Sequence, residues 1–220
     1  LHGHGHPAIV SAIAEQVRTL DHVMLAGFTH EPAVALAEAL LADAPGDYGR
    51  VFYADCGSAA IEVAMKMSFQ RRQQEGEPKR IRFAALRNGY HGETLGALGV
   101  GGTDDYRAMF APLLPDVLYL PAPKFADHRH TALDSDLGAD DAAADEAVAL
   151  LRRHASELTA LVLEPLVQGA GKMAMTGAGY YARVVREAQA LGIHVIADEI
   201  AVAFGRTGRL FASEWAGVEP

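Results

Sequence analysis

The sequence predicts an α/β protein in which a mainly parallel sheet is covered by helices on both faces. Two observations carry this prediction. Short apolar runs typical of buried strands alternate along the chain with longer segments whose apolar residues recur at helical spacing. Half of the 220 residues are hydrophobic, which is ample for a core. Strands separated by helices in this order favour right-handed crossovers and helices on both sides of the sheet.

Each expected element follows from its local pattern. Pro7 opens the first helix, and Gly192 stops the last one in the position that glycine favours after a helix. The expected helices cover residues 7–20, 32–41, 58–71, 141–154 and 179–191. The expected strands cover residues 51–54, 81–86, 117–120, 161–163 and 193–197. Residues 124–145 are polar, acidic and rich in alanine, so we expect an exposed excursion there.

Composition and charge exclude several classes of protein. The chain has 19 basic and 28 acidic residues, a net charge of −9, whereas binding nucleic acid or an anionic membrane by bulk charge needs surplus Lys and Arg. The hydrophobic content is too high for disorder, and no apolar run approaches the roughly 20 residues of a membrane span. The single cysteine, Cys56, excludes a disulfide framework, and no signal peptide opens the chain. We therefore expect a cytoplasmic protein.

Both ends of the sequence look cut rather than natural. The first residue is Leu1 rather than Met, and the chain stops at Pro220 without a terminal element. We expect a longer parent protein. Within the present chain, residues 1–48 are expected to form an N-terminal helical segment that leads into a large α/β domain over residues 49–220.

The residues that follow the expected strands are the first candidates for a site, because ligands bind beyond the carboxyl ends of strands in open parallel sheets. Gly57 and Ser58 follow the first strand and lead directly into a helix. Gly57 permits a tight turn, and Ser58 presents a hydroxyl and free N–H groups at a helix N-terminus, where phosphate binds well. An ordinary serine N-cap fits the same residues. Neither a Walker A pattern nor a G-x-G-x-x-G fingerprint after a strand is present.

Two further strand ends carry polar or aromatic side chains. Glycines on both sides of Tyr90-His91 allow these side chains to project from a tight turn, where an aromatic ring would cover one face of a planar ligand. A turn with a packed tyrosine is the alternative. Glu164 and Gln168 follow the strand at 161–163 and precede a glycine-rich loop, which suits a polar ligand or an ordinary surface loop.

The last strand ends in a carboxylate and leads to an arginine. Asp198 follows an apolar run at the rim of the sheet, where a carboxylate is costly unless it is paired. A cationic ring nitrogen would be a suitable partner, and so would a neighbouring arginine. Arg206 lies in a glycine-bounded turn and has the fork geometry to hold a substrate carboxylate, although most arginines are simply exposed.

The remaining reactive residue types carry weaker signals. His2, His4 and His6 alternate near the start of the chain without a carboxylate or cysteine partner, so no metal site is predicted. His194 lies inside a strand pattern and is expected to be structural. Cys56 adjoins the candidate phosphate turn, and we expect burial rather than reactivity.

A phosphate cradle, an aromatic ring and a carboxylate for a ring nitrogen together describe a pyridoxal phosphate pocket. The chain resembles the class III, fold-type I aminotransferases, and within them the branch that serves biotin synthesis. Asp198-Glu199-Ile200 and the Phe204–Gly208 turn are typical of the class. The similar stretches run almost from end to end of the chain: residues 3–7, 22–30, 54–67, 87–94, 164–171 and 196–208.

The resemblance implies a fold-type I large domain that binds pyridoxal 5′-phosphate. In such a domain Gly57 and Ser58 hold the cofactor phosphate. Tyr90 lies over the cofactor, Asp198 pairs with the pyridine nitrogen, and Ile200 packs against the ring. The catalytic residues implied are Asp198 and Tyr90.

The resemblance also implies a reaction and a partner. Tyr90 would contact the amino donor, S-adenosylmethionine, and Arg206 would receive the carboxylate of the acceptor, 8-amino-7-oxononanoate. A homodimer is implied, because active sites of the family lie at the subunit interface. Another class III ω-aminotransferase and a non-catalytic fragment without the lysine remain alternatives.

The chain departs from the family pattern in several respects. The tryptophan-bearing stretch that precedes the Gly-His motif in relatives, the C-terminal part of the large domain and the small domain are expected to be missing. The family lysine that carries the cofactor should follow Asp198 on a later strand, beyond Pro220. Val202 and Ala203 replace a usual threonine and glycine, and an added methyl would strain the arginine turn if the φ angle at 203 is positive. None of the lysines of this chain occupies the family position: Lys66, Lys79, Lys124 and Lys172.

Overall fold

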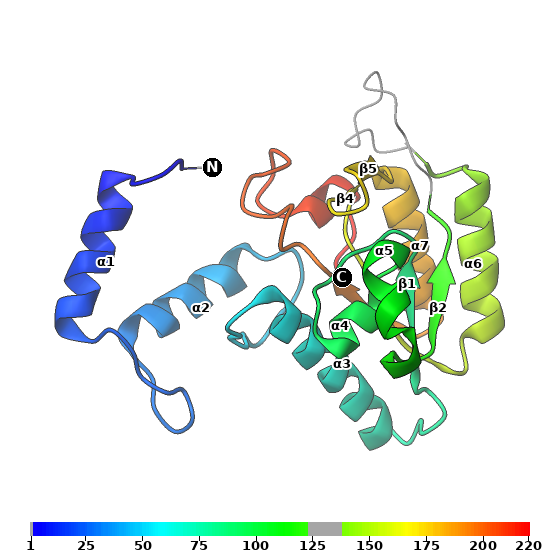
Figure 1. The fold of residues 1–220 in the computed structure, drawn as a ribbon, viewed down its shortest axis with the longest axis horizontal. Coiled ribbons are helices and arrows are strands. Elements are labelled where there is room, and N and C mark those ends of the chain that lie inside the picture. Colours follow the sequence, from blue (N-terminus) through cyan, green and yellow to red (C-terminus); the bar gives the residue numbers. More distant parts are fainter. Residues whose placement is uncertain (1, 123–137) are drawn as a thin grey trace. The chain divides into compact units, whose positions relative to one another are not determined.

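The computed structural model describes residues 2–122 and 138–220. The chain divides into two compact units, residues 1–52 and 53–220. The first unit contains the helices α1 (Pro7–Thr19) and α2 (Glu31–Asp43), each with proline at its start (Figure 1). Neither of these helices has a buried residue. None of the described helices combines the length and the apolar character needed to cross a lipid bilayer.

The second unit is built on a parallel sheet with the strand order β2–β1–β3–β6. One row across the sheet pairs Tyr119 with Ala85, Ala85 with Val162, and Val162 with Ile196. The parallel arrangement confirms the predicted fold class. The strands of this sheet are β1 (Arg82–Leu86), β2 (Val117–Leu120), β3 (Leu158–Leu163) and β6 (His194–Ala197).

Helices cover both faces of this sheet, because successive side chains of a strand point to opposite faces. Leu161 and Leu163 of β3 belong to one buried cluster with α6 and α7, whereas Ala160 and Val162 belong to a second cluster with α3 and α4. The strand is therefore buried along its whole length. The helices of this layer structure are α3 (Gly57–Gln74), α4 (Leu95–Val100), α6 (Ala142–His154) and α7 (Ala178–Ala190).

The long helices begin and end for identifiable reasons. Asp141 caps α6, and its carboxylate accepts the N–H of Ala143 at 2.7 Å. Leu191 is the C-cap residue of α7, and Gly192 comes directly after it, as predicted. Gly192 has a φ angle of +66°, which glycine adopts without strain. Smaller elements that the sequence pattern did not predict complete the unit: α5 (Asp104–Arg107), the 3₁₀ helices η1 (Ala108–Leu113) and η2 (Ala212–Trp215), and the hairpin β4 (Val167–Gln168) with β5 (Ala174–Met175).

One predicted strand is wrong. Residues 51–54 have no regular secondary structure, and the Phe52 side chain is 66% exposed. An apolar run becomes a strand only when a neighbour accepts and donates its backbone hydrogen bonds, and no described strand pairs with these residues. The predicted excursion over residues 124–145 falls largely outside the described residues, and its last part is the start of α6.

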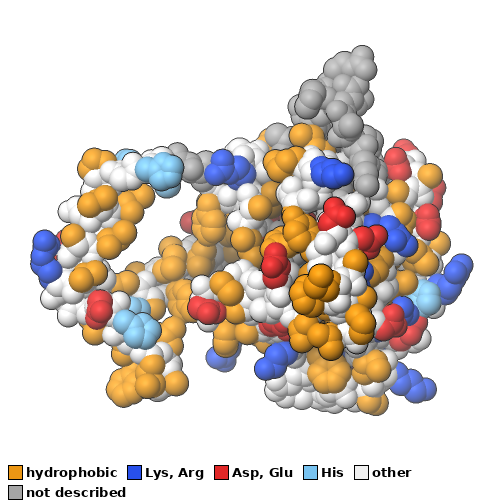
Figure 2. Space-filling model, in the orientation of Figure 1, with side chains coloured by type: hydrophobic (Ala, Val, Ile, Leu, Met, Phe, Trp, Pro, Cys, Tyr) orange, Lys and Arg blue, Asp and Glu red, His pale blue; other side chains and the backbone are white. Residues whose placement is uncertain are grey.

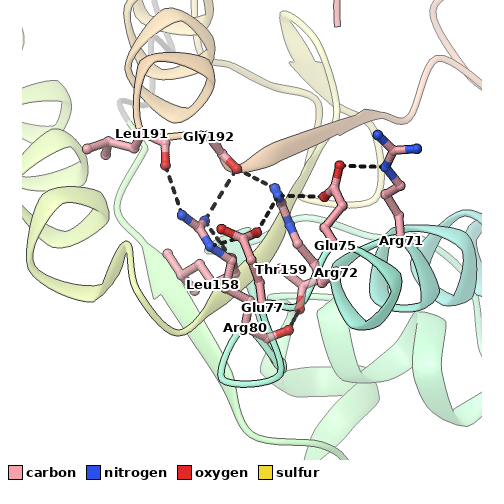
Figure 3. Close-up of polar contacts among 9 residues, drawn as sticks. All are labelled: Arg71, Arg72, Glu75, Glu77, Arg80, Leu158, Thr159, Leu191 and Gly192. Atoms are coloured by element: carbon pink, nitrogen blue, oxygen red, sulfur yellow. Dashed lines mark hydrogen bonds and ion pairs between the residues drawn. The ribbon is translucent and has the colours of Figure 1, made fainter.

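At the sheet end where β3 and β6 begin, two arginines join the end of α3 to the end of α7 (Figure 3). Arg72 is buried, donates to the Glu77 carboxylate at 2.8 Å and also donates to the Gly192 carbonyl. Arg80 reaches the Leu191 and Gly192 carbonyls at 3.3 Å. Cations suit the carbonyl-rich C-terminus of a helix. We call Arg72, Glu77 and Arg80 the arginine clasp.

Candidate functional site

A cavity of about 280 Å³ lies at the carboxyl ends of β1, β3 and β6, next to the start of α3. This is the end of the sheet where the sequence predicted a ligand site. The volume is slightly below the range of about 300–1,000 Å³ usual for small-molecule sites. The cavity is lined by the residues predicted for the cofactor, which are Gly57, Ser58, Tyr90, Asp198 and Ile200.

The start of α3 presents free hydrogen-bond donors to this cavity. Cys56 is the N-cap residue but makes no side-chain capping bond, and the first helical hydrogen bond runs from Ala60 N–H to Cys56 at 3.0 Å. Within the described part of the chain, no group accepts the N–H of Gly57 or Ser58. Unpaired donors and the helix dipole make such an end attractive to an anion.

Gly57 packs close to the side chain of Ile200. A Cβ atom at Gly57 would lie 2.9 Å from Cδ1 of Ile200, closer than carbon atoms normally approach. The Ser58 hydroxyl oxygen accepts the N–H of Glu93 at 3.3 Å, and its own proton is left available for a ligand. The first turn of α3 therefore has the geometry and the donors of an anion cradle.

Asp198 is held in a fixed position at the end of β6. It is only 6% exposed, and one carboxylate oxygen lies 2.7 Å from Nδ1 of His91. The other oxygen accepts the N–H of Ile200 at 3.1 Å. A carboxylate only accepts, so the proton of this pair is assigned to His91 Nδ1. A buried, oriented carboxylate at a cavity wall suits a cationic N–H group of a ligand.

Glu164 joins the two loops that border the cavity. It is 6% exposed, and it accepts the N–H of Tyr90 at 3.0 Å and the N–H of Gly169 at 2.9 Å. Burial raises the pKa of the Glu164 carboxyl, while these two N–H groups and His91 act in the opposite direction. This carboxylate anchors the Tyr90 turn to the loop after β3.

The Tyr90 side chain lies at the cavity border. Its ring packs against the ring of Tyr106 at a centroid distance of 5.4 Å and a tilt of 59°. Its hydroxyl lies 3.4 Å from the Glu93 carboxylate. Partial burial and this neighbouring carboxylate raise the pKa of Tyr90, so the phenol stays neutral at physiological pH.

Arg206 does not line the cavity, unlike the other predicted site residues. Its side chain is exposed. The turn around it is tight, since Arg206 N–H bonds to Ala203 at 3.3 Å and Gly208 N–H bonds to Gly205 at 3.1 Å. The positive φ angles of the turn fall on Phe204, Gly205 and Gly208, not on Ala203, so the strain considered for Ala203 does not arise.

The structure corrects one expectation and adds two residues. Cys56 is exposed, so the expected burial of this thiol is wrong: as the N-cap residue it precedes the packed part of α3. His91 and Glu164 line the cavity and hold other site residues, although the sequence pattern assigned neither a specific role. The glycines around His91 and the apolar strand before Glu164 marked both residues as candidates in the sequence. The sequence did not show that either side chain would be buried.

Among the described residues, no cluster of His, Cys, Asp and Glu could hold a metal ion.

The fold is shared with solved transaminases, and the comparison with known families agrees. The family described as Aminotransferase class-III matches residues 1–220, and the chain belongs to it. The fold-type I architecture predicted from the resemblance is confirmed by solved transaminases.

Curated relatives of the chain share one enzyme name. The adenosylmethionine-8-amino-7-oxononanoate aminotransferase of Synechococcus elongatus is 43% identical over the whole chain, and that of Geobacter sulfurreducens is 40% identical. The chain spans 50% and 48% of their lengths, respectively. It therefore corresponds to about half of these relatives.

Solved structures are similar over nearly the entire chain. The crystal structure of the enzyme with the same name from Methanocaldococcus jannaschii has a TM-score of 0.85 at 30% identity, covering 96% of this chain and 45% of that one. An amine transaminase from an uncultivated Pseudomonas species, solved in its PLP-bound form, has a TM-score of 0.84 at 32% identity, covering 99% and 49%.

Proposed function

We propose that the protein containing this chain is the pyridoxal phosphate-dependent aminotransferase of biotin biosynthesis. It would move an amino group from S-adenosylmethionine to 8-amino-7-oxononanoate and so form 7,8-diaminononanoate. The proposal rests on the names of the curated relatives. The structural observation that carries it is one cavity that combines a helix N-terminus with free donors and a buried, oriented carboxylate.

The residues of the cavity fit pyridoxal phosphate group by group. The phosphate suits the first turn of α3, where the N–H groups of Gly57 and Ser58 have no other described acceptor. The pyridine nitrogen suits Asp198, and the planar ring suits the faces offered by Tyr90 and Ile200. When bound, the cofactor supplies an electron sink for the carbanion formed during amino transfer.

Each residue then has a definite task. The Ser58 hydroxyl would donate a hydrogen bond to the phosphate. Asp198 would keep the ring nitrogen protonated, and the hydrogen bond from His91 Nδ1 keeps the carboxylate oriented. Tyr90 would cover the ring and contact the amino donor. Arg206, which is exposed, would receive the acceptor carboxylate at the substrate entrance.

Proton transfer in both half-reactions needs a general acid and base, which in this family is a lysine. None of the described residues that line the cavity is a lysine. The resemblance to the family supports the proposal that the catalytic lysine follows Asp198 on a later strand. Alone, the chain is expected to bind the cofactor without turning over substrate.

We also propose a cytoplasmic homodimer. Residues 49–220 would form the cofactor-binding large domain, and residues 1–48 would lead into it. The apolar side chains of α1 support a second subunit: Ile13 and Val17 are 60% and 61% exposed, and Figure 2 shows hydrophobic groups along this surface. A helix with an exposed apolar face gains stability when a partner covers it.

One alternative has support of its own. The PLP-bound amine transaminase is 32% identical to this chain, slightly more than the 30% of the Methanocaldococcus enzyme. A class III ω-aminotransferase with a diamine or γ-amino acid donor would fit the same cavity. The two differ in the amino donor that they accept.

Mass spectrometry and a donor assay test the proposal. The protein is expressed from its full reading frame, and its intact mass is measured with pyridoxal phosphate before and after borohydride reduction. A mass above 23.4 kDa with a reduced cofactor adduct on one lysine supports a complete aminotransferase. Acceptance of S-adenosylmethionine then supports the biotin enzyme, and acceptance of diamines alone supports the alternative. A mass of 23.4 kDa without an adduct would refute the catalytic proposal.

A further inference from the structure

A carboxylate on α3 holds the start of α4. Thr94 is the N-cap residue of α4, but its side chain makes no capping bond to that helix. Instead, one oxygen of Glu62 accepts the N–H of Gly96 at 2.8 Å and the N–H of Ala97 at 3.3 Å. The same oxygen accepts the Thr94 hydroxyl at 2.7 Å. Since acidic groups stabilise helix N-termini, Glu62 supplies the cap that α4 lacks.

Helix α3 packs closely at two points against residues 92–97, the segment that leads into α4. A Cβ atom at Gly96 would lie 2.2 Å from a carboxylate oxygen of Glu62, and one at Gly92 would lie 2.0 Å from the Ser58 hydroxyl oxygen. Ser58 and Glu62 are four residues apart and therefore lie on the same face of α3. Ser58 also accepts the N–H of Glu93. One face of α3 is thus fitted closely to residues 92–97.

Residues 92–97 belong to a longer segment, residues 88–102, whose two ends are joined by hydrogen bonds. Asn88 donates its N–H to Gly102 at 3.1 Å, and Gly102 donates to Gly89 at 2.7 Å. Residues 88–102 therefore form a closed loop that follows β1 and carries Tyr90 and His91 to the cavity. Glu164 and Asp198 hold the Tyr90–His91 part of this loop, Tyr119 holds its far end, and the contacts with α3 hold the part between them.

We propose that Glu62 is a positioning residue for the cofactor pocket. By capping α4 it fixes the part of the loop that follows Tyr90 and His91 against α3, and it acts together with the contacts of Glu164 and Asp198 to position these two residues beside the first turn of α3. The inference rests on the proposed function, because that turn is the proposed phosphate cradle. Glu62 does not line the cavity, so it acts through the loop of residues 88–102.

Hydrogen exchange tests this role without any cofactor. In the protein expressed from its full reading frame, Glu62→Ala should speed amide exchange across residues 88–102. Glu62→Gln keeps an acceptor oxygen and should restore the wild-type rate. Lys66→Ala is the matched control, because Lys66 is exposed one turn further along α3. Circular dichroism at the temperature of the experiment confirms that every variant is folded.

Cofactor affinity provides the second readout. Titration with pyridoxal 5′-phosphate should show affinity about five- to tenfold weaker for Glu62→Ala, the usual size of a lost cap, and near wild type for Glu62→Gln and Lys66→Ala. A purely structural role would lower the melting temperature and leave the affinity of the folded protein unchanged, and that result would overturn the proposal.

A double variant isolates the contact itself. Gly96→Ala should weaken cofactor affinity in the wild type, because the new methyl displaces the Glu62 carboxylate. In the Glu62→Ala background the carboxylate is gone, so Gly96→Ala should add no further loss. Additive losses, or unchanged exchange in Glu62→Ala, would overturn the role of Glu62. Failure of the wild type to bind the cofactor would instead refute the proposed function, and the exchange experiment would still decide whether Glu62 holds the loop.

Discussion

Gly92 offers a sharp test of the packing between the Tyr90 turn and α3. Its φ angle is +122°, and a Cβ atom there would lie 2.0 Å from Oγ and 2.7 Å from Cβ of Ser58. Gly92→Ala therefore combines a backbone cost of about 1–3 kcal/mol with an overpacking cost of about 1–3 kcal/mol. The sum predicts a loss of roughly 2–6 kcal/mol in the free energy of unfolding.

Gly76 provides the matched control for this substitution. Its φ angle is +79°, but nothing lies within 4 Å of a Cβ atom built there. Gly76→Ala therefore carries only the backbone cost, about 1–2 kcal/mol. Ser58 must also move in Gly92→Ala, so affinity for pyridoxal phosphate should fall about tenfold or more, as for loss of a charge-assisted hydrogen bond. Gly76→Ala should leave the affinity unchanged.

Urea denaturation of the apoprotein and cofactor titration measure both quantities. Each variant is compared with the wild type in the same buffer and at the same protein concentration. Equal losses of stability in Gly92→Ala and Gly76→Ala, together with equal cofactor affinities, would show that the Tyr90 turn does not press on Ser58. The assignment of Ser58 to the cradle would then lose its geometric basis.

Three further predictions follow from individual contacts. Asp198→Asn should lower kcat/KM by about 10²–10³, because the buried charge that would pair with the ring nitrogen is lost. The free energy of unfolding of the apoprotein should change by only about 1 kcal/mol. Steady-state kinetics and urea denaturation of the same variant measure the two effects. Burial raises the pKa of Tyr119 to about 12, and its hydroxyl lies 2.8 Å from the Gly101 carbonyl. The neutral phenol therefore favours the folded state, and this contribution is present below pH 10 and is lost as the pH rises toward 12. Tyr119→Phe should be less stable than the wild type by about 1 kcal/mol at pH 7, and denaturation at several pH values should show the gap closing above pH 10. Asp141→Ala should cost about 1 kcal/mol through the lost cap of α6, whereas Asp140→Ala should cost less than about 0.5 kcal/mol in the same denaturation assay.

The sheet was predictable because strands buried on both faces must be nearly continuous apolar runs. Residues 161–163 carried that signal, and β3 is buried along its whole length. Residues 51–54 carried the same signal and form no strand, since composition reports apolar character but not the presence of a hydrogen-bonding neighbour. Local pattern therefore predicted the strands of the sheet, together with one segment that is neither buried nor part of a strand.

The sequence predicted those site residues that directly follow an apolar strand. It did not predict the contacts that form where two loops distant in sequence come together. Asp198 follows an apolar strand, so a buried carboxylate was foreseen from one local pattern. The burial of Glu164 depends on the approach of the Tyr90 turn and of Gly169, which are distant from each other in sequence. The same applies to the contact between His91 and Asp198. Such contacts become visible only when the sheet has brought its strand ends together.

The arginine clasp has a consequence for how this protein can change during evolution. Helix α3 has 18 residues and is about 27 Å long, with the clasp near one end and the first turn at the other. Its orientation is secured by Arg72, far from any ligand, so the first turn can keep donors that no protein group uses. The far end of the helix therefore stays anchored whichever anion the first turn holds. The clasp gives α3 a fixed end that does not depend on the binding chemistry of the other end.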